Sequence, residues 1–350
     1  MADPSVPSDS SGPTGEAPAP KPETPPGPFS TATASTGAGW RRWVPSLRTM
    51  GLAPLALIGL VVVYYVGGMI WLTKVDDNPE FGLPSDAPDG ASVSVAIAAD
   101  LIERETETHR WVSNDPVFMP GSMLDNMPNF QQGILTALFR FTSELRDEIA
   151  RTRGSSSEDL DVKAASGYLS YPPDVWIYDP KVSWWAPTAP SEKQYGQGMR
   201  SLRQYNQRLA DGEARFEARA DNLQTLIDRF TSDIGSASAT ISRHIEEQST
   251  NWLDFQADDV FYANKGRLYA YYLLMRGMQE DFADVISEKG LGNAWRQTMK
   301  SLKEAATLQP WVVMNGSTDS QFRPSHLASQ GFYLLRARTQ LKEISNILLK

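Results

Sequence analysis

Cysteine is absent from this chain of 350 residues, and histidine occurs only three times. Without thiols the protein has no disulfide bonds, no thiol redox chemistry and no metal centre with cysteine ligands. The three histidines, His109, His244 and His326, lie far apart and form no HExxH pair or other spacing typical of metal ligands. We therefore expect no metal site, and we interpret each histidine as a surface or packing residue.

Motifs for catalysis or cofactor binding are also missing. The region after residue 75 has no nucleophile elbow, glycine-rich phosphate loop or dinucleotide fingerprint. Asp159 and Asp161 resemble the start of a calcium loop, but its later glycine and glutamate are missing, which favours a solvated acidic loop. Acidic residues outnumber basic ones by 42 to 33, which disfavours binding to nucleic-acid phosphates. We expect no cofactor, no nucleic-acid partner and no enzymatic activity.

Large apolar residues are scarce in residues 1–39, which contain nine prolines among serine, threonine, glycine and alanine. Such a segment cannot bury enough apolar surface to offset the entropy lost on ordering its backbone. We predict a disordered, proline-rich tail.

Residues 52–72, by contrast, are a run of 21 residues without a charged side chain. As a helix the run is about 32 Å long, which is enough to cross a hydrocarbon core of about 30 Å. It begins about fifty residues into the chain and lacks a small-x-small cleavage site, which favours an uncleaved transmembrane helix over a signal peptide.

Basic residues flank this predicted span unequally. Arg41, Arg42 and Arg48 lie at its start, in or next to the basic segment 40–51, whereas Lys74 alone follows it closely. By the positive-inside rule, the tail is cytoplasmic and residues 75–350 lie across the membrane. We predict a single-pass protein of the bacterial inner membrane with a periplasmic domain.

Small residues recur on one face of the span, at Gly59, Val63 and Gly67. A spacing of four residues lets a neighbouring helix approach closely, so these residues are candidates for packing within the membrane. Glycine is also common in lipid-facing helices, and this second interpretation stays open.

After residue 90 the apolar residues recur with the period of a helix. We predict an all-α fold, an elongated helical bundle within residues 75–350. Its helices are expected over residues 92–112, 129–153, 191–233, 258–288, 293–308 and 325–349.

The strongest periodic signal lies in the predicted helix 191–233. Asn206 and Glu213 interrupt the second position of its heptad, which favours an intramolecular bundle over a dimeric coiled coil. A homo-oligomer stays open as an alternative. Residues spaced by seven form the main seam: Leu202, Leu209, Phe216, Leu223 and Phe230.

One segment, residues 168–195, combines aromatic residues with prolines and contains a predicted loop or short hairpin in VWIY and KVSWW. Its rings could form a surface that binds a glycan or a protein, or they could cover the helical core. The candidate surface residues are Tyr171, Trp176, Tyr178, Trp184 and Trp185.

Four stretches resemble a known family: VDDNPEF after the span, LDNMPNFQQG, RTRGSSSEDLD and GEARFEARADNLQ. The family is a bacterial inner-membrane family known as domain of unknown function 2333. The resemblance covers roughly residues 55–350, and it implies a membrane topology and an all-helical character. It assigns no active residue.

These observations lead to a first hypothesis, a non-enzymatic, membrane-anchored envelope protein whose periplasmic domain scaffolds or docks onto another envelope component. The alternative is a module that binds or cleaves glycans with the Trp-rich loop, which needs two carboxylates about 5–10 Å apart. A transmembrane sensor is disfavoured, because the cytoplasmic tail is too short for a signalling domain.

Overall fold

The computed structural model describes residues 47–72, 75–82, 87–150, 158–179, 183, 185–248, 254, 256–310, 312–316 and 324–350. Within these ranges the regular structure is helical and contains no strand beyond one isolated bridge, between Asn315 and Ser325. The all-α prediction is therefore confirmed. The predicted tail 1–39 and the start of the basic segment lie outside the described residues.

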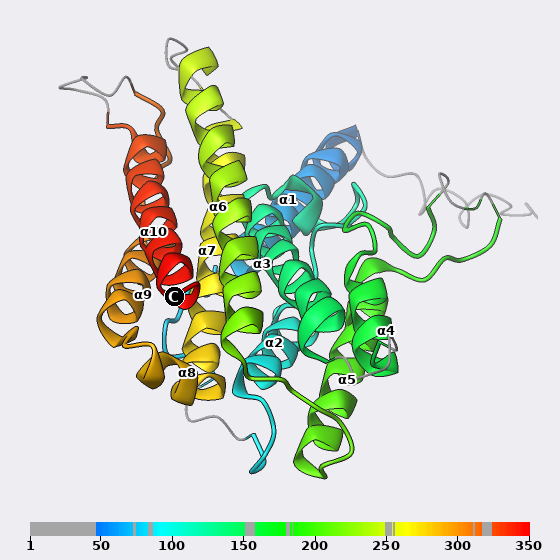
Figure 1. Ribbon diagram of the computed structural model, residues 1–350. Helices are drawn as coiled ribbons and strands as arrows, with labels where there is room; N and C mark the ends of the chain where they lie inside the picture. The colour runs from blue at the N-terminus through cyan, green and yellow to red at the C-terminus, as the bar shows by residue number, and fades with distance from the viewer. Residues whose placement is uncertain are drawn as a thin grey trace, which may run out of the picture. The chain divides into compact units, whose positions relative to one another are not determined.

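Internal contacts divide the chain into residues 1–56 and residues 57–350. The second unit contains the helical bundle and residues 57–72 of the first helix. Figure 1 shows the helices. They are α1 (Leu47–Leu72), α2 (Val93–Glu103), α3 (Asn126–Glu144), α4 (Leu160–Leu169), α5 (Ser191–Ala210), α6 (Ala220–Gln248), α7 (Gln256–Asp281), α8 (Ala283–Glu288), α9 (Gly292–Ala306) and α10 (His326–Leu348).

Helix α1 coincides with the predicted span. Within it, Pro54–Leu72 is long and apolar enough to cross a membrane, and no other helix among the described residues passes this test of length and composition. A signal sequence would pass the same test.

Several helix ends follow from local chemistry. Ser92 and Ser325 cap α2 and α10, because their hydroxyls accept hydrogen bonds from N–H groups of the first turn. Helices α2 and α3 each continue into a π-helical turn, Arg104–Thr108 and Leu145–Ile149. The predicted boundaries near residues 92 and 325 are confirmed by these caps.

The predicted single helix 191–233 is wrong. Helix α5 ends at Ala210, and Gly212 has φ +73°, the left-handed conformation that closes many helices. Helix α5 then packs against α2 and α4, whereas α6 packs against α10 and, more weakly, α3 and α7 (Figure 1). The heptad therefore continues in sequence across two helices that have different neighbours.

The seam residues are nevertheless internal. Leu202, Leu223 and Phe230 are buried among helices of the same chain, and Phe216 in the connection packs on Phe282 at 5.5 Å between ring centroids. Asn206 accepts a hydrogen bond from the N–H of Ser92 at 2.8 Å, which explains a polar residue at a seam position. The burial supports the intramolecular bundle over the coiled coil.

Two other predictions need correction. Asp159 and Asp161 do not belong to a solvated loop, because Asp159 caps α4 and both carboxylates pair with Arg208 of α5. For the segment predicted as a loop or short hairpin, the described part is a loop, and the hairpin alternative is wrong there. Hydrogen bonds from the N–H groups of Thr188 and Ser191 to Ile177 and Val175 join two arms of an irregular loop without forming a ladder.

The central helix is α7, which contacts α2, α3, α6, α8, α9 and α10. Glycines allow its closest approach to α3: a Cβ atom on Gly266 would lie 2.0 Å from the carbonyl oxygen of Phe130. A Cβ atom on Gly133 of α3 would lie 2.1 Å from the carbonyl oxygen of Ala263. The two backbones therefore touch at a spacing that only glycine permits.

We predict that Gly266→Ala destabilises the protein by about 1–3 kcal/mol, because the new methyl group must push two backbones apart. Gly167→Ala is the matched control, since Gly167 lies in α4, is exposed and has room for a Cβ atom, which would meet nothing within 4 Å. It should stabilise by about 0.5–1 kcal/mol through helix propensity. Urea unfolding of the full chain in detergent measures both, and effects of the same sign would contradict the close approach.

Candidate functional site

The segment after the predicted span, Val75 to Gly82, lies against α7 and is held by side chains of that helix. Lys265 Nζ lies 2.7 Å from an Asp77 carboxylate oxygen, and the Tyr269 hydroxyl donates to the carbonyl oxygen of Asn78 at 2.7 Å. Arg276 donates to the carbonyl oxygens of Pro79, at 2.6 Å, and Phe81. We call Lys265, Tyr269 and Arg276, together with Arg104, the clamp.

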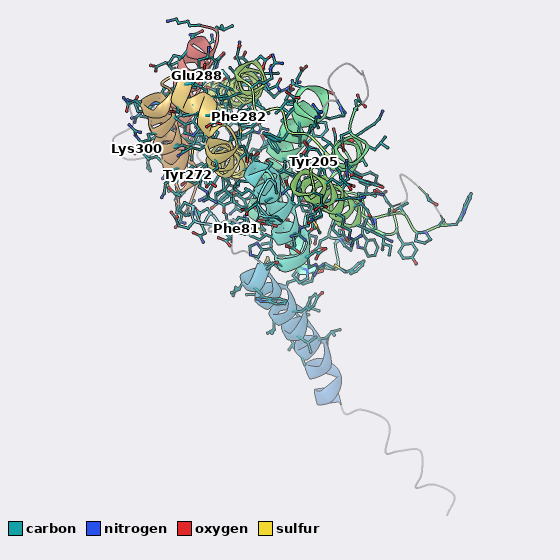
Figure 2. All side chains as sticks on the ribbon, turned by 60° about the horizontal axis from the view of Figure 1, so that its bottom comes forward. Phe81, Tyr205, Tyr272, Phe282, Glu288 and Lys300 are labelled. Atoms are coloured by element: carbon teal, nitrogen blue, oxygen red, sulfur yellow. The ribbon has the colours of Figure 1, made fainter. Side chains whose placement is uncertain are left out.

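Arg104 completes the clamp from the π-helical turn after α2. Its guanidinium lies 4.5 Å from the centroid of the Phe81 ring and donates to the Tyr269 hydroxyl at 2.8 Å. Phe81 in turn packs against the core (Figure 2). The fully buried Glu105 pairs with Arg104 at 2.7 Å and balances its charge.

The clamp buries charge where burial is costly. The Lys265 side chain is only 2% exposed, and this burial lowers its pKa although Asp77 opposes the shift. Burial also raises the pKa of Tyr269 to about 12, so its hydroxyl stays a donor. Removing one member of such a pair leaves an uncompensated buried charge. The arrangement positions a chain segment, and it does not pair a nucleophile with a base.

In the sequence, VDDNPEF stands out only as one stretch of the family resemblance. Its role as the partner of α7 was missed, because the residues that hold it come about 190 positions later. The available signal for a buried partner of α7 was the presence of the polar residues Lys265, Tyr269 and Arg276 among the apolar residues of this helix.

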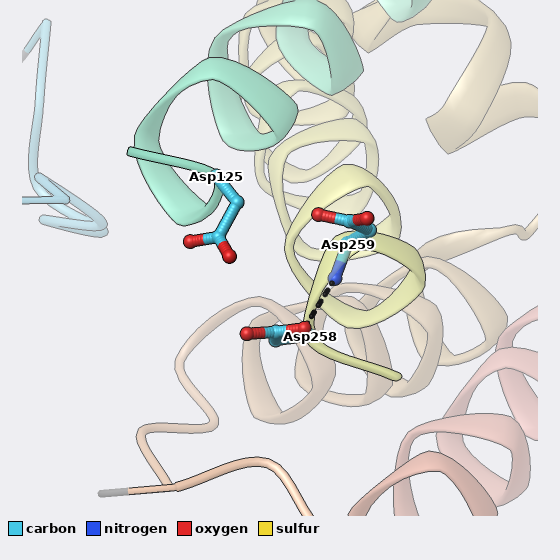
Figure 3. A group of neighbouring side chains, drawn as sticks. All are labelled: Asp125, Asp258 and Asp259. Carbon is cyan, nitrogen blue, oxygen red and sulfur yellow. Dashed lines mark hydrogen bonds between the residues drawn. The ribbon is translucent and has the colours of Figure 1, made fainter. Parts of the chain in front are cut away.

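A second group joins three carboxylates from two helix starts (Figure 3). Asp125 caps α3, and Asp258 and Asp259 lie in the first turn of α7. One oxygen from each lies within 4.8 Å of the others, an arrangement of hard ligands that a divalent cation could bridge. Each carboxylate also has a structural role without an ion, because negative charge stabilises a helix N-terminus. Burial and repulsion from Asp125 raise the pKa values of Asp258 and Asp259.

The predicted aromatic surface divides into an inner and an outer part. Tyr171 is half-buried and donates to the carbonyl oxygen of Ala189, so it covers the core. Trp176 packs edge-on against Phe118 and Tyr178, with ring centroids 5.6 and 5.9 Å away. Tyr178 and Trp185 are exposed. Trp184 lies outside the described residues.

In the span, Gly59, Val63 and Gly67 are exposed, and a Cβ atom on either glycine would meet nothing within 4 Å. Their packing against another chain stays a prediction. The neighbouring Gly68 has the contact instead, because a Cβ atom there would lie 2.4 Å from the Pro120 ring.

The histidines each have a neighbour of their own. His244 Nε2 lies 2.8 Å from Asp254, which also accepts from Asn315, and these two hydrogen bonds lower the pKa of Asp254 although burial opposes them. His326 accepts from the backbone of Met314. His109 lies 3.8 Å from Asp76 of the clamped segment. The three rings do not converge on one site.

A cavity of about 250 Å³ lies between α2 and α5 and is lined in part by Asp100, Arg203 and Asn206. Arg203 pairs there with Asp100 at 2.9 Å and with Glu103 at 2.7 Å. The charge of Arg203 is therefore balanced by two carboxylates of the same bundle.

For the clamp, we predict that Lys265→Met lowers the free energy of unfolding by about 3–5 kcal/mol, because Asp77 loses its buried cation. Lys303→Met is the matched control, because Lys303 pairs with Glu80 of the same segment in an exposed ion pair. It should cost less than about 1 kcal/mol. Equal losses in urea titrations of the full chain would show that the clamp contributes no special stability.

For the carboxylates, we predict that Asp258→Asn raises the unfolding temperature at pH 7. Burial, and then repulsion from Asp125, raise the pKa of Asp258, so its charged form destabilises the folded state above that pKa, and protonation relieves this cost as the pH falls. The gain should therefore shrink as the pH approaches 4, while Asp284→Asn in the first turn of α8 gives none. Thermal melts from pH 7 to pH 4 measure this, and a lower melting temperature for Asp258→Asn at pH 7 contradicts it.

The chain was compared with known proteins. A model of the family described as uncharacterized protein conserved in bacteria (DUF2333) matches residues 89–251 and 242–350. No curated protein and no solved structure gives a significant match. The two matched segments together cover the helical unit from the turn before α2 to the last residue. On this evidence the chain belongs to the DUF2333 family of uncharacterized bacterial proteins.

Proposed function

We propose that this protein is a non-enzymatic scaffold anchored in the bacterial inner membrane by α1. Its N-terminal tail is cytoplasmic, and its helical domain, residues 75–350, docks onto another envelope component in the periplasm. The distribution of Arg41, Arg42, Arg48 and Lys74 supports this orientation.

The clamp carries the proposal. A flexible linker would be enough to keep an enzyme near a membrane, and it would not require a buried lysine. Here Asp77, Asn78 and the residues up to Phe81 are fixed to the central helix by paired charges and hydrogen bonds. Such an attachment holds the domain in one position relative to the segment leaving α1, which suits a scaffold.

A docking face lies on α10. Phe332 and Leu335 are large, exposed apolar residues, and Ala328 and Thr339 continue their stripe at helical spacing. A hollow of about 490 Å³ beside the stripe is lined by Pro324, Ala328 and Tyr333 among others. The other faces of α10 pack on α6 and α9. An exposed apolar stripe beside a hollow is typical of a protein-binding surface.

The glycan-binding alternative is supported by the exposed rings of Tyr178 and Trp185, which could stack on sugars. Trp176 is less suited to this role, because it packs edge-on against Phe118 and Tyr178. The cavities beside α2 and α10 are lined by none of these rings. Docking through α10 is therefore the better supported function.

We predict that a photo-crosslinking amino acid at Phe332 or Leu335 of the full chain captures a discrete product in intact bacteria. Mass spectrometry of the product then distinguishes another envelope protein from a second copy of this chain. The control position is Asn346, which is exposed near the end of the same helix and should give no such product.

The clamp provides a second arm of this experiment. Crosslinking from Phe332 should fall in the Lys265→Met variant and persist in Lys303→Met. Absence of any product at Phe332 and Leu335, or equal products at Asn346, would contradict docking through α10.

A further inference from the structure

The loop between the π-helical turn of α2 and the start of α3 lies beside α1. The Tyr65 hydroxyl donates to the carbonyl oxygen of Val117 at 2.7 Å, and the Tyr64 hydroxyl donates to that of Phe118 at 3.3 Å. The ring of Pro120 lies against Gly68 so closely that a Cβ atom there would be 2.4 Å from it. These contacts fix residues 117–120 at the level of residues 64–68 of α1.

That level is well inside the apolar part of α1. Pro54–Leu72 has 19 residues and is therefore about 28 Å long, so its whole length is needed to cross a hydrocarbon core of about 30 Å. Gly68 lies about 6 Å and Tyr65 about 10 Å before its last residue. Because side chains on a helix lean toward its N-terminus, the tyrosine hydroxyls lie no closer to the end of α1 than their own backbone.

The composition of the loop fits an apolar environment. Residues 116–124, PVFMPGSML, contain no charged side chain and two prolines, which have no N–H group to satisfy. The flanking charge at Asp115 is paired with Arg110 at 2.6 Å. Val117 is 83% exposed and Phe118 is 55% exposed, and Met123 is also exposed. These are apolar side chains that the protein itself does not cover.

Part of the loop backbone has the internal partners that polar groups need in a membrane. Four successive carbonyl oxygens, those of residues 116–119, accept hydrogen bonds. That of Pro116 accepts from the N–H of Met119, and that of Met119 accepts from the Ser122 hydroxyl at 2.7 Å. Those of Val117 and Phe118 accept from the two tyrosines. The tyrosines equally need these acceptors, because a hydroxyl in hydrocarbon is costly without one.

Aromatic residues of the segment 168–195 continue this apolar surface. Phe118 packs on Trp176, Trp176 packs on Tyr178, and Tyr178 is exposed. Tryptophan and tyrosine beside a membrane-embedded segment are typical of the interface between hydrocarbon and water.

We propose that residues 116–123 form a loop embedded in the lipid bilayer, in the same leaflet as the C-terminal turns of α1, with Trp176 and Tyr178 at the interface above it. The ligand of this surface is the hydrocarbon of the membrane. The inference rests on the proposed anchoring by α1. It means that the domain contacts the membrane at a second place and cannot rotate freely about its anchor.

The absence of cysteine provides a clean test. Single variants Val117→Cys, Phe118→Cys, Val63→Cys and Leu160→Cys of the full chain are labelled with a nitroxide and placed in vesicles of phosphatidylethanolamine and phosphatidylglycerol. Electron paramagnetic resonance then compares the access of oxygen, which enters lipid, with that of a water-soluble nickel chelate. Val63 reports the span, and Leu160 is an exposed apolar residue at the start of α4.

The oxygen-to-nickel access ratio at Val117 and Phe118 should match that at Val63 and exceed that at Leu160 by about tenfold or more, because hydrocarbon excludes the polar chelate. If Val63 is in lipid and both loop labels resemble Leu160, the embedded loop is wrong and the anchor stands. If the loop labels are protected from both reagents, a protein covers them and the lipid assignment is wrong. If the nickel chelate reaches the label at Val63, both the anchoring by α1 and the embedded loop are wrong.

Discussion

Helix α7 is largely buried in its middle part, and the positions of its neighbours depend on how closely α3 can approach it. The contact is made by Gly266 and Gly133, each of which leaves no room for a methyl group. The second glycine of α7, Gly277, gives a similar contact with the backbone of Ser94 in α2. Because interiors are close-packed, backbones set at this distance also fix the side chains around them.

The polar residues of α7 use this central position to join distant parts of the chain. The buried Tyr271 hydroxyl donates to Asp233 of α6 at 2.8 Å. Two arginines lie beside the same carboxylate: Arg267 of α7 at 3.3 Å and Arg140 of α3 at 3.7 Å. Lys265 and Tyr269 hold the segment that follows α1 in the same way. Buried ionic groups specify one arrangement more than they add stability, since each is costly to leave unpaired.

The helical bundle is attached to the region of α1 at two places. The clamp fixes the chain just after Leu72, and Tyr64 and Tyr65 bind the loop at Val117 and Phe118. Two attachments made at different levels restrict rotation in a way that one linker cannot. In the proposed function, this restriction keeps the apolar stripe of α10 at a set height and direction for its partner.

The sequence alone determined the features that depend on local chemistry. The period of apolar residues predicted helices at α2, α3, α7, α9 and α10, because burial on a helix repeats every 3.6 residues whatever lies beside it. The run 52–72 predicted α1, whereas α4 was not predicted. The cap at Ser325 is local in the same sense. The heptad spacing wrongly predicted one helix through Gly212, because the spacing happens to continue through the turn that separates α5 from α6.

Only the tertiary structure decided which buried faces meet. The carboxylates of Asp125 and Asp258 are more than a hundred residues apart, as are Asn78 and Tyr269, and no local pattern relates them. The loop at Val117 could not be placed from its sequence, because PVFMPGSM is too short for any periodic signal. Its position beside Tyr65 follows from how α2 and α3 pack on α7. That packing depends on glycines, whose lack of a Cβ atom matters only where two backbones come into contact.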